Sequence, residues 1–154
     1  MSKPKERFKL IPAVYLVLRR GNKVLLLRRA NTGYQDGKYS TVAGHLEGDE
    51  LATEAMAREA REEAGIAIDP KTLKLAHTAH RLSRNQVGQE RIDLFFEANE
   101  WQGDIKNAEP DKCDDISWHD VVNLPEDMLP FVKRVLADIS QGVQYSEYTE
   151  EPVD

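Results

Sequence analysis

The segment GHLEGDELATEAMAREAREEAGI, residues 44–66, is unusually rich in carboxylates. Its acidic residues are Glu47, Asp49, Glu50, Glu54, Glu59, Glu62 and Glu63. Residues 51–64 contain no Gly or Pro and many Ala, and Gly65 stands where a helix C-terminal glycine is expected. The segment therefore predicts a loop, then a helix whose start is served by Asp49 or Glu50, and a sharp stop.

Three of these acids share one side of the predicted helix. At about 100° per residue, Glu59, Glu62 and Glu63 fall within one sector. Like charges at such spacings cost roughly a few tenths of a kcal/mol per pair, so their grouping has no intrinsic advantage for folding. A solvated face is one interpretation, because Arg58 has Glu54 and Glu62 four residues away. A divalent cation that takes several carboxylate oxygens is the other, and spacing alone leaves both open.

The order of residues in this segment matches a known signature. The fixed positions are filled in turn by Gly44, Glu50, Arg58, Glu59, Glu62, Glu63, Gly65 and aliphatic Ile66. The segment thus resembles the signature of the Nudix hydrolase superfamily, and so many ordered positions are far more specific than a lone glycine motif. The resemblance implies an α/β fold, an α/β/α sandwich with a mixed β-sheet and a loop-helix-loop catalytic motif, from Ala13 to about Gln141.

The resemblance also implies roles for these residues. Glu59, Glu62 and Glu63 would be the core ligands of catalytic Mg²⁺ or Mn²⁺. Arg58 would orient a glutamate through an ion pair, and Glu50 would support the site from the start of the helix. Gly44 and Gly65 would permit the tight backbone at the two ends of the helix region.

A further ligand is expected from outside the signature. In many relatives a glutamate follows a tryptophan by about eight residues, and Glu109 follows Trp101 at that interval. Glu109 is therefore a candidate ligand or general base. The implied reaction is hydrolysis of a nucleoside diphosphate linked to another group, in which metal ions neutralise the anionic diphosphate and acidify a water. Glu62, Glu63 and Glu109 all remain candidates to accept the proton of that water.

Substrate contacts are expected from residues before the signature. Arg28 and Arg29 end a predicted strand where the family often places a phosphate-contacting arginine, although a solvated strand end explains them equally well. Tyr34, in a glycine-rich loop, is the best candidate for contact with a base. The arginines at positions 81, 84 and 91 are weaker candidates, since a solvated hairpin is the expected setting for them.

The remaining sequence predicts strands and one more helix. Expected strands are two runs within 13–30 joined at Gly21-Asn22, then 39–44, 73–83, 91–98 and the start of 116–125. Residues 84–90 are expected to form a hairpin loop, and 128–142 an amphipathic helix. The tail from about residue 145 to 154 is expected to be weakly ordered. Length and pattern predict one domain over residues 1–154.

Composition narrows the partners. A net charge of -6 disfavours a surface for a nucleic-acid duplex and suits a small nucleotide substrate. Cys113, the single cysteine, is expected to be a buried, reduced thiol. No apolar run has the length of a signal peptide or a membrane span, so a cytoplasmic protein is expected. The sequence leaves the existence of a homodimer open.

Two other functions are compatible with the same fold. A non-catalytic module that binds a nucleotide as a sensor is the main alternative, but such modules can lose the acidic set, which is intact here. An isomerase acting on a prenyl diphosphate would bring a catalytic cysteine near the metal. Because Cys113 lies well outside residues 44–66, the isomerase ranks last. Among hydrolase substrates, nucleoside triphosphates, normal or modified, rank first, with sugar nucleotides and dinucleotides still open.

Overall fold

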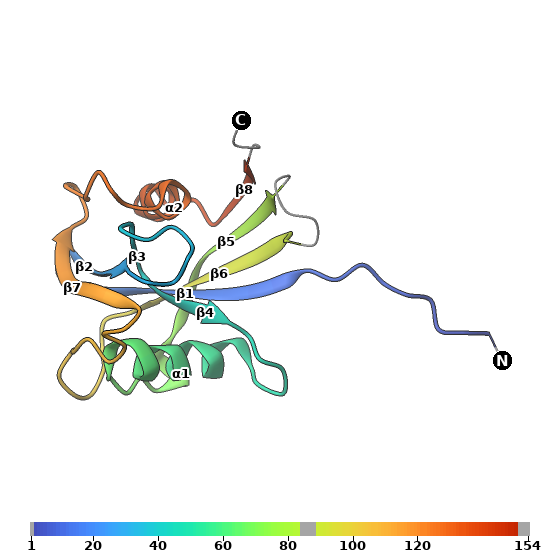
Figure 1. The fold of residues 1–154 in the computed structure, drawn as a ribbon, viewed down its shortest axis with the longest axis horizontal. Coiled ribbons are helices and arrows are strands. Elements are labelled where there is room, and N and C mark those ends of the chain that lie inside the picture. The colour runs from blue at the N-terminus through green and yellow to red at the C-terminus, as the bar shows by residue number, and fades with distance from the viewer. Residues whose placement is uncertain (1, 84–88, 151–154) are drawn as a thin grey trace.

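The protein is an α/β/α sandwich, as the signature implied. A computed structural model describes residues 2–83 and 89–150. Helix α1 (Ala52–Ala64) covers one face of a mixed sheet, and helix α2 (Pro130–Ser140) covers the other (Figure 1). Within the described residues, no helix is long and apolar enough to cross a membrane.

The sheet is built around β1. Its strands are β1 (Ile11–Arg20), β2 (Lys23–Arg29), β3 (Tyr39–Ser40), β4 (Val42–His45), β5 (Lys74–Ser83), β6 (Arg91–Ala98), β7 (Cys113–Asp120) and β8 (Tyr145–Glu150). The order is β3-β2-β1-β6-β5-β8, while β4 pairs with β1 and β7 with β2. The pairs β1·β6 and β5·β8 are parallel, and the other pairs are antiparallel. A short 3-10 helix, η1 (Pro70–Thr72), precedes β5.

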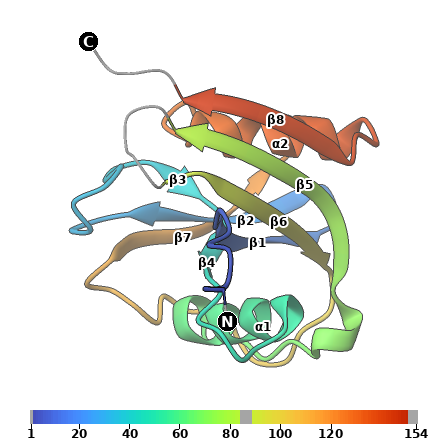
Figure 2. The same cartoon turned by 90° about the vertical axis from the view of Figure 1, so that its right-hand side faces the viewer.

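Burial of β1 on both faces follows from its continuous apolar sequence. Successive side chains of a strand point to opposite faces. Val14, Leu16 and Leu18 accordingly join the core under α1. Ala13, Tyr15 and Val17 join the core under α2. The strand therefore contributes to two hydrophobic layers, one under each helix, and Figure 2 shows α1 and α2 on opposite sides of the sheet.

Most of the predicted strands are present. The turn at Gly21 has a positive φ of 58°, and it joins β1 to β2 with Arg20 opposite Lys23, as expected for a hairpin. The predicted strand over 39–44 is two strands in the structure, because β3 pairs with β2 whereas β4 pairs with β1. Strands β5 and β6 are antiparallel, but residues 84–88 of their predicted loop lie outside the described residues.

The C-terminal tail differs from its prediction. Residues 145–150 form β8, which runs parallel to β5 from Thr78↔Tyr145 to Ser83↔Glu150. Tyr148 is 8% exposed and joins the core under α2, which explains why a polar segment is ordered here. The prediction of weak order was thus wrong for residues 145–150. Residues 151–154 lie outside the described part of the chain.

Candidate active site

Backbone constraints set both ends of α1. The N-cap is Leu51, whose N–H donates to the Glu54 carboxylate at 2.9 Å, so neither Asp49 nor Glu50 caps the helix. At the other end Gly65 has a left-handed φ of 69°. A Cβ there would also lie 2.6 Å from Cε of Lys106, but that flexible side chain can move, so the left-handed φ is what favours glycine.

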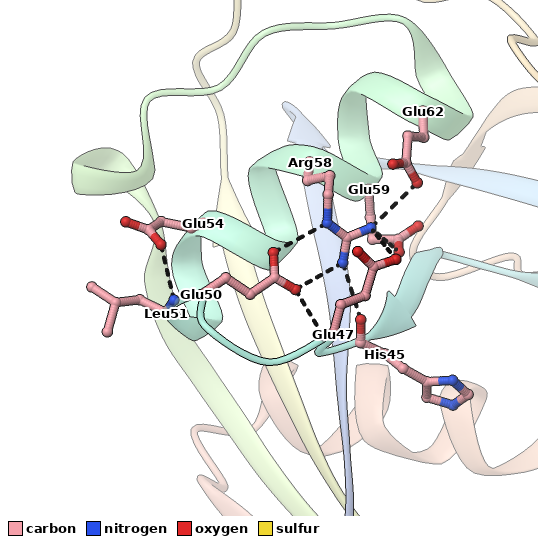
Figure 3. Close-up of polar contacts among 8 residues, drawn as sticks. All are labelled: His45, Glu47, Glu50, Leu51, Glu54, Arg58, Glu59 and Glu62. Carbon is pink, nitrogen blue, oxygen red and sulfur yellow. Dashed lines mark hydrogen bonds and ion pairs between the residues drawn. The ribbon is translucent and has the colours of Figure 1, made fainter.

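Arg58 is the centre of a charged cluster on α1 (Figure 3). Its Nη2 and Nε donate to the two oxygens of Glu50 at 2.9 and 3.1 Å, a bidentate pair. Its Nη1 contacts Glu59 at 2.8 Å and Glu62 at 3.3 Å, and Nη2 also donates to the His45 carbonyl at 3.1 Å. The bond from Arg58 holds the pKa of Glu50 below its usual range. One guanidinium therefore joins the loop before the helix to two predicted metal ligands.

The ion pairs predicted for a solvated helix face are only partly present. The pair Arg58–Glu62 is formed, but Glu54 contacts the backbone of Leu51 instead. Glu59 is only 12% exposed. A Cβ on Gly44 would lie 2.1 Å from the carboxylate carbon of Glu59, so this glycine makes room for the acid. Burial is the main cause that raises the pKa of Glu59. This acid thus points inward, not to solvent.

Glu63 is brought near Glu109 by the loop before β7. The N–H of Ala108 donates to the Glu63 carbonyl at 3.2 Å, which ties this loop to the last turn of α1. Burial, followed by the charges of Glu59 and Glu109, raises the pKa of Glu63 well above its ordinary value. A hydrogen bond from the Ala43 backbone opposes that rise. The structure therefore places Glu109 close enough to Glu63 for the two carboxylates to interact.

These acids suit a hard divalent cation. Carboxylate oxygens are its preferred ligands, and a cation would offset the burial and then the repulsion from Glu59 and Glu109 that raise the pKa of Glu63. Within residues 2–83 and 89–150, however, no three His, Cys, Asp or Glu side chains already form a metal-binding group. One oxygen each of Glu59 and Glu62 is bonded to Arg58. The carboxylates suit the cation chemically, although Glu59 and Glu62 are turned toward Arg58.

A pocket of about 270 Å³ opens beside Glu63 and Glu109. The predicted residues that line it are Arg28, Arg29, Tyr34, Gly44, Glu63 and Glu109. The structure therefore brings all three predicted substrate contacts to the same cavity as two of the predicted acids. The predicted residues that do not line it are Glu50, Arg58, Glu59, Glu62 and Gly65. We call this cavity the active-site pocket.

The two predicted arginines differ in their partners. Arg28 forms an ion pair with Asp114 at 2.7 Å, and that bond raises the pKa of its guanidinium. Arg29 donates to the Tyr34 carbonyl at 2.9 Å and to Thr32 Oγ1 at 3.2 Å. No ion pair to a carboxylate holds Arg29 within the described residues, so its charge is the better match for a phosphate.

Sequence reasoning misjudged or missed several pocket residues. Arg81 is 4% exposed and paired with Asp93 at 3.1 Å, so the expected solvated hairpin is wrong for it. Arg91 contacts His45 at 3.0 Å, and both line the pocket. Position 84 lies outside the described residues. Cys113 is buried, as expected, but it also lines the pocket.

No local motif marks most of the missed residues, because they come from strands, loops and a helix outside the signature. Further pocket residues without a sequence signal are Tyr15, Lys112, Leu129 and Phe131. The prenyl diphosphate isomerase was ranked last because Cys113 is far from the signature in sequence. That argument fails, because Cys113 and Glu63 line the same pocket. The Cys113 thiol donates to the Asp115 carbonyl at 3.1 Å, and burial raises its pKa, which keeps it a poor nucleophile.

Comparison with known proteins agrees with the signature and the fold. A family model described as the NUDIX domain matches residues 9–139. The chain therefore belongs to the Nudix hydrolase superfamily, whose members generally use divalent metals. It is 31% identical over 117 residues to the NAD-capped RNA hydrolase NudC of Stutzerimonas stutzeri, covering 76% of this chain and 39% of that protein. NudC of Pseudomonas aeruginosa is likewise 31% identical over 117 residues, covering 76% of this chain and 38% of its own.

Solved structures show the same fold. The MutT NUDIX hydrolase from Burkholderia pseudomallei superposes with a TM-score of 0.76 at 20% identity, covering 84% of this chain and 98% of that one. A MutT protein from Bacillus halodurans gives a TM-score of 0.74 at 20% identity, covering 93% and 92%. The chain spans about two fifths of the length of its NudC relatives. These likenesses support the fold, while the reaction rests on the site.

Proposed function

We propose that this chain is a divalent-metal-dependent pyrophosphohydrolase that cleaves a nucleoside diphosphate linked to another group and releases a nucleoside monophosphate. The observation that carries the proposal is that Glu63, Glu109 and Arg29 line the same pocket. Glu63 lies on α1, Glu109 lies in the loop before β7, and Arg29 ends β2. Hydrolysis of a diphosphate requires carboxylates that hold a metal ion and a positively charged side chain that contacts a phosphate.

Each residue has a defined task in this proposal. The ligands of Mg²⁺ or Mn²⁺ would be Glu59, Glu62, Glu63 and Glu109. When bound, the cation would neutralise charge on the diphosphate and lower the pKa of a water. Arg58 keeps the carboxylates of Glu59 and Glu62 oriented. Arg29 is positioned to contact a phosphate, with its guanidinium fixed by Thr32 and the Tyr34 carbonyl. Glu62, Glu63 and Glu109 remain the candidates for the proton acceptor.

The first candidate substrate is a nucleoside triphosphate, normal or modified. The pocket of about 270 Å³ suits a small ligand. The net charge of -6 disfavours a long polyanion. A second candidate is a dinucleotide such as NAD, free or at the end of an RNA. It is favoured by the NudC relatives, whose name describes hydrolysis of NAD-capped RNA, at 31% identity.

The test is a mass-spectrometric screen of the purified protein with Mg²⁺. Substrates are nucleoside triphosphates, oxidised nucleotides, sugar nucleotides, NAD and an NAD-capped RNA oligonucleotide. Glu63→Gln should lower kcat/KM at least about 100-fold, because it removes a carboxylate from the reaction centre. The matched control is Glu54→Gln on the same helix. Glu54 contacts the Leu51 backbone and does not line the pocket, so its variant should keep wild-type turnover.

Three outcomes would contradict parts of this proposal. Equal activity of Glu63→Gln and wild type, with both folded, would make the acidic face structural. Tight nucleotide binding without any cleavage would make the chain a sensor module. Cleavage of NAD or the capped RNA with no cleavage of nucleoside triphosphates would replace the first candidate substrate by the second.

A further inference from the structure

The active-site pocket borders the first residues of β1. Ala13 and Tyr15 of β1 line the pocket, and so does Arg91, the first residue of β6. Ile11 lies opposite Arg91 in the parallel pair β1·β6, and its N–H donates to the Glu90 carbonyl at 3.0 Å. The chain that precedes Ile11 therefore leaves the sheet from the rim of the pocket.

Residues 2–10, which we call the N-terminal arm, are exposed along their whole length. The arm extends from the start of β1 away from the rest of the molecule (Figure 1). Its basic residues are Lys3, Lys5, Arg7 and Lys9, whereas Glu6 is its only acid. Within residues 2–83 and 89–150, no ion pair to a carboxylate involves these four basic side chains. The arm is thus a positively charged segment of a chain whose net charge is -6.

The spacing of the basic residues relates them to the pocket. Successive side chains of an extended segment point to opposite sides, and in β1 the odd-numbered residues Ala13 and Tyr15 line the pocket. All four basic residues of the arm also have odd numbers, so an arm that continues this alternation presents its cations on the pocket side. Alternate residues of an extended chain lie about 6.6 Å apart, which is close to the spacing of successive phosphates along a single-stranded nucleic acid.

Arg91 connects the arm to the pocket. Its Nη1 contacts Nε2 of His45 at 3.0 Å, and its Nη2 donates to the side-chain oxygen of Gln89 at 3.2 Å. Burial, followed by the charges of Arg91 and Arg81, lowers the pKa of His45, so this imidazole is neutral at pH 7. Among the described residues no carboxylate forms an ion pair with Arg91, so its charge is available to a phosphate at the rim.

We propose that the N-terminal arm binds the single-stranded RNA chain of a substrate whose 5′-terminal diphosphate lies in the active-site pocket. The proposal rests on the proposed function, because it selects a capped RNA among the candidate substrates of the same pocket. Lysine and arginine contact phosphates, and Phe8, which is 75% exposed, offers a ring on which a base can stack. The remainder of the chain is more acidic than the whole, so it repels a polyanion and favours a path along the arm.

The test compares binding of RNA with binding of a mononucleotide and needs no turnover. Fluorescence anisotropy measures Kd for a 3′-labelled RNA of about 12 nucleotides with a 5′-monophosphate, which is the expected product. Isothermal titration calorimetry measures Kd for AMP. Wild type should bind the RNA at least about tenfold more tightly than AMP. The arm variant, with K3Q, K5Q, R7Q and K9Q together, should lose this advantage at low salt and keep its Kd for AMP within about twofold.

A control variant of equal net charge separates the arm from general electrostatics. It combines K23Q, K71Q, K74Q and K133Q, which replace exposed lysines that lie outside the arm and do not line the pocket. The slope of log Kd for RNA against log salt concentration should fall by about 2–3 in the arm variant, since each phosphate contact in a single strand contributes about 0.7. The control variant should keep the wild-type slope.

Phe8→Leu tests the aromatic part of the arm without a change of charge. Loss of the ring should weaken RNA binding about fivefold and leave the salt slope as in wild type, because stacking does not release counterions. Equal Kd values for RNA in wild type and Phe8→Leu would contradict the stacking role of Phe8.

The proposal is overturned if the arm variant and the control variant bind RNA with the same Kd and salt slope, or if wild type binds RNA no more tightly than AMP. Vesicles of anionic phospholipid and light scattering after gel filtration test two other partners of the arm. With RNA binding unaffected by the arm variant, arm-dependent vesicle binding would assign the arm to a lipid surface, and arm-dependent dimerisation would assign it to a second copy of the chain. Arm-dependent RNA binding with a failed hydrolysis screen would keep the arm proposal and reject only the hydrolase.

Discussion

Arg58 shows how one residue can organise the acidic face of a helix. The side chain is 23% exposed and contacts Glu50, Glu59 and Glu62 as well as the His45 carbonyl. A planar guanidinium with five N–H donors can serve all these acceptors, whereas a lysine has a single ammonium. The residue thus couples the loop after β4 to the predicted metal ligands without facing the pocket itself.

Arg58→Lys should therefore impair both folding and turnover. Loss of the bidentate contact to Glu50 should lower the free energy of unfolding by about 1–3 kcal/mol. We also expect kcat to fall, because Glu59 and Glu62 lose their orientation. Chemical denaturation and steady-state kinetics measure the two effects. Arg61→Lys, an exposed position on the same helix, is the control. Similar values for both variants would show that Arg58 is only a surface charge.

Tyr39 provides a residue-scale test of pH dependence. Its hydroxyl donates to Asp115, and this bond, together with one from Ser117, lowers the pKa of Asp115. Burial and the contact with Asp115 raise the pKa of Tyr39 to about 12. Because the pKa of Asp115 is lower in the folded protein, the unfolded chain binds more protons than the folded protein in acid. The stabilisation is therefore present above about pH 4 and is lost as pH falls through the lower folded pKa.

Tyr39→Phe should remove this stabilisation. At pH 7 we expect a loss of about 1–2 kcal/mol in the free energy of unfolding. The difference between wild type and variant should shrink as pH falls from about 4, where Asp115 is protonated in the unfolded chain, through its lower pKa in the folded protein. Urea denaturation across pH checks both statements, with Tyr34→Phe as the exposed control. A difference that does not change with pH would show that the Asp115 charge is not involved.

At the scale of elements, β8 is the least expected part of the fold. Its sequence, YSEYTE, is polar, yet the strand pairs in parallel with β5 along its whole length. Tyr148 packs into the core under α2, and its hydroxyl donates to Asp138 on that helix at 3.3 Å. The strand therefore contributes one buried aromatic side chain to the layer that also supports Phe131.

Tyr148→Ala should destabilise the protein through the loss of that buried ring. Replacement of a buried aromatic residue by alanine typically costs about 3–5 kcal/mol. Tyr145→Ala is the matched control, because Tyr145 lies on the same strand and is 53% exposed. It should change the free energy of unfolding by about 0.5 kcal/mol or less. Thermal denaturation compares the two. Equal small effects would mean that β8 does not pack against α2 in solution.

At the scale of the whole molecule, two cores share one sheet and the pocket draws on both. The core under α1 carries the acidic helix, and the core under α2 includes Tyr15 and supports Phe131, which both line the pocket. The short β3 links the layers, since Tyr39 exchanges backbone hydrogen bonds with residues 127 and 129 just before α2. The relative placement of the acids and these two aromatic residues is therefore a property of the complete sandwich.

A divalent cation should stabilise this assembly as a whole. Burial first, and then neighbouring negative charges, raise the pKa of Glu59 and Glu63 in the native state, and a bound cation would offset both effects. At a hundredfold excess over Kd, binding adds about 2.7 kcal/mol, which raises Tm by roughly 5–10 °C for a chain of this size. Differential scanning calorimetry with Mg²⁺ or Mn²⁺, against NaCl of equal ionic strength, measures this. Glu63→Gln should show a clearly smaller shift, and an equal shift would place the cation elsewhere.

Local sequence was sufficient for the acidic helix and its C-terminal end, but not for its N-cap, which is Leu51 and not Asp49 or Glu50. Helical period, the absence of Gly and Pro, and Gly65 predicted α1 correctly, because hydrogen bonds within a helix join residues close in sequence. Two strand pairs joined by short turns or loops, β1·β2 and β5·β6, were predicted for the same reason. Glu109 was predicted only from its interval after Trp101, which resembles that of relatives outside the signature, and not from any local pattern.

The sequence by itself thus determined both helices, most of the strands, the signature and the family, since each is read from residues close together in the chain. Only the tertiary structure decided that Arg81 is buried against Asp93, that Cys113 lines the pocket, and that residues 145–150 complete the sheet. These features depend on which distant strands pair. The parallel pairs β1·β6 and β5·β8 are not joined by a tight turn, so no local sequence pattern predicts their contact. Burial and charge pairing across such contacts are properties of the folded chain alone.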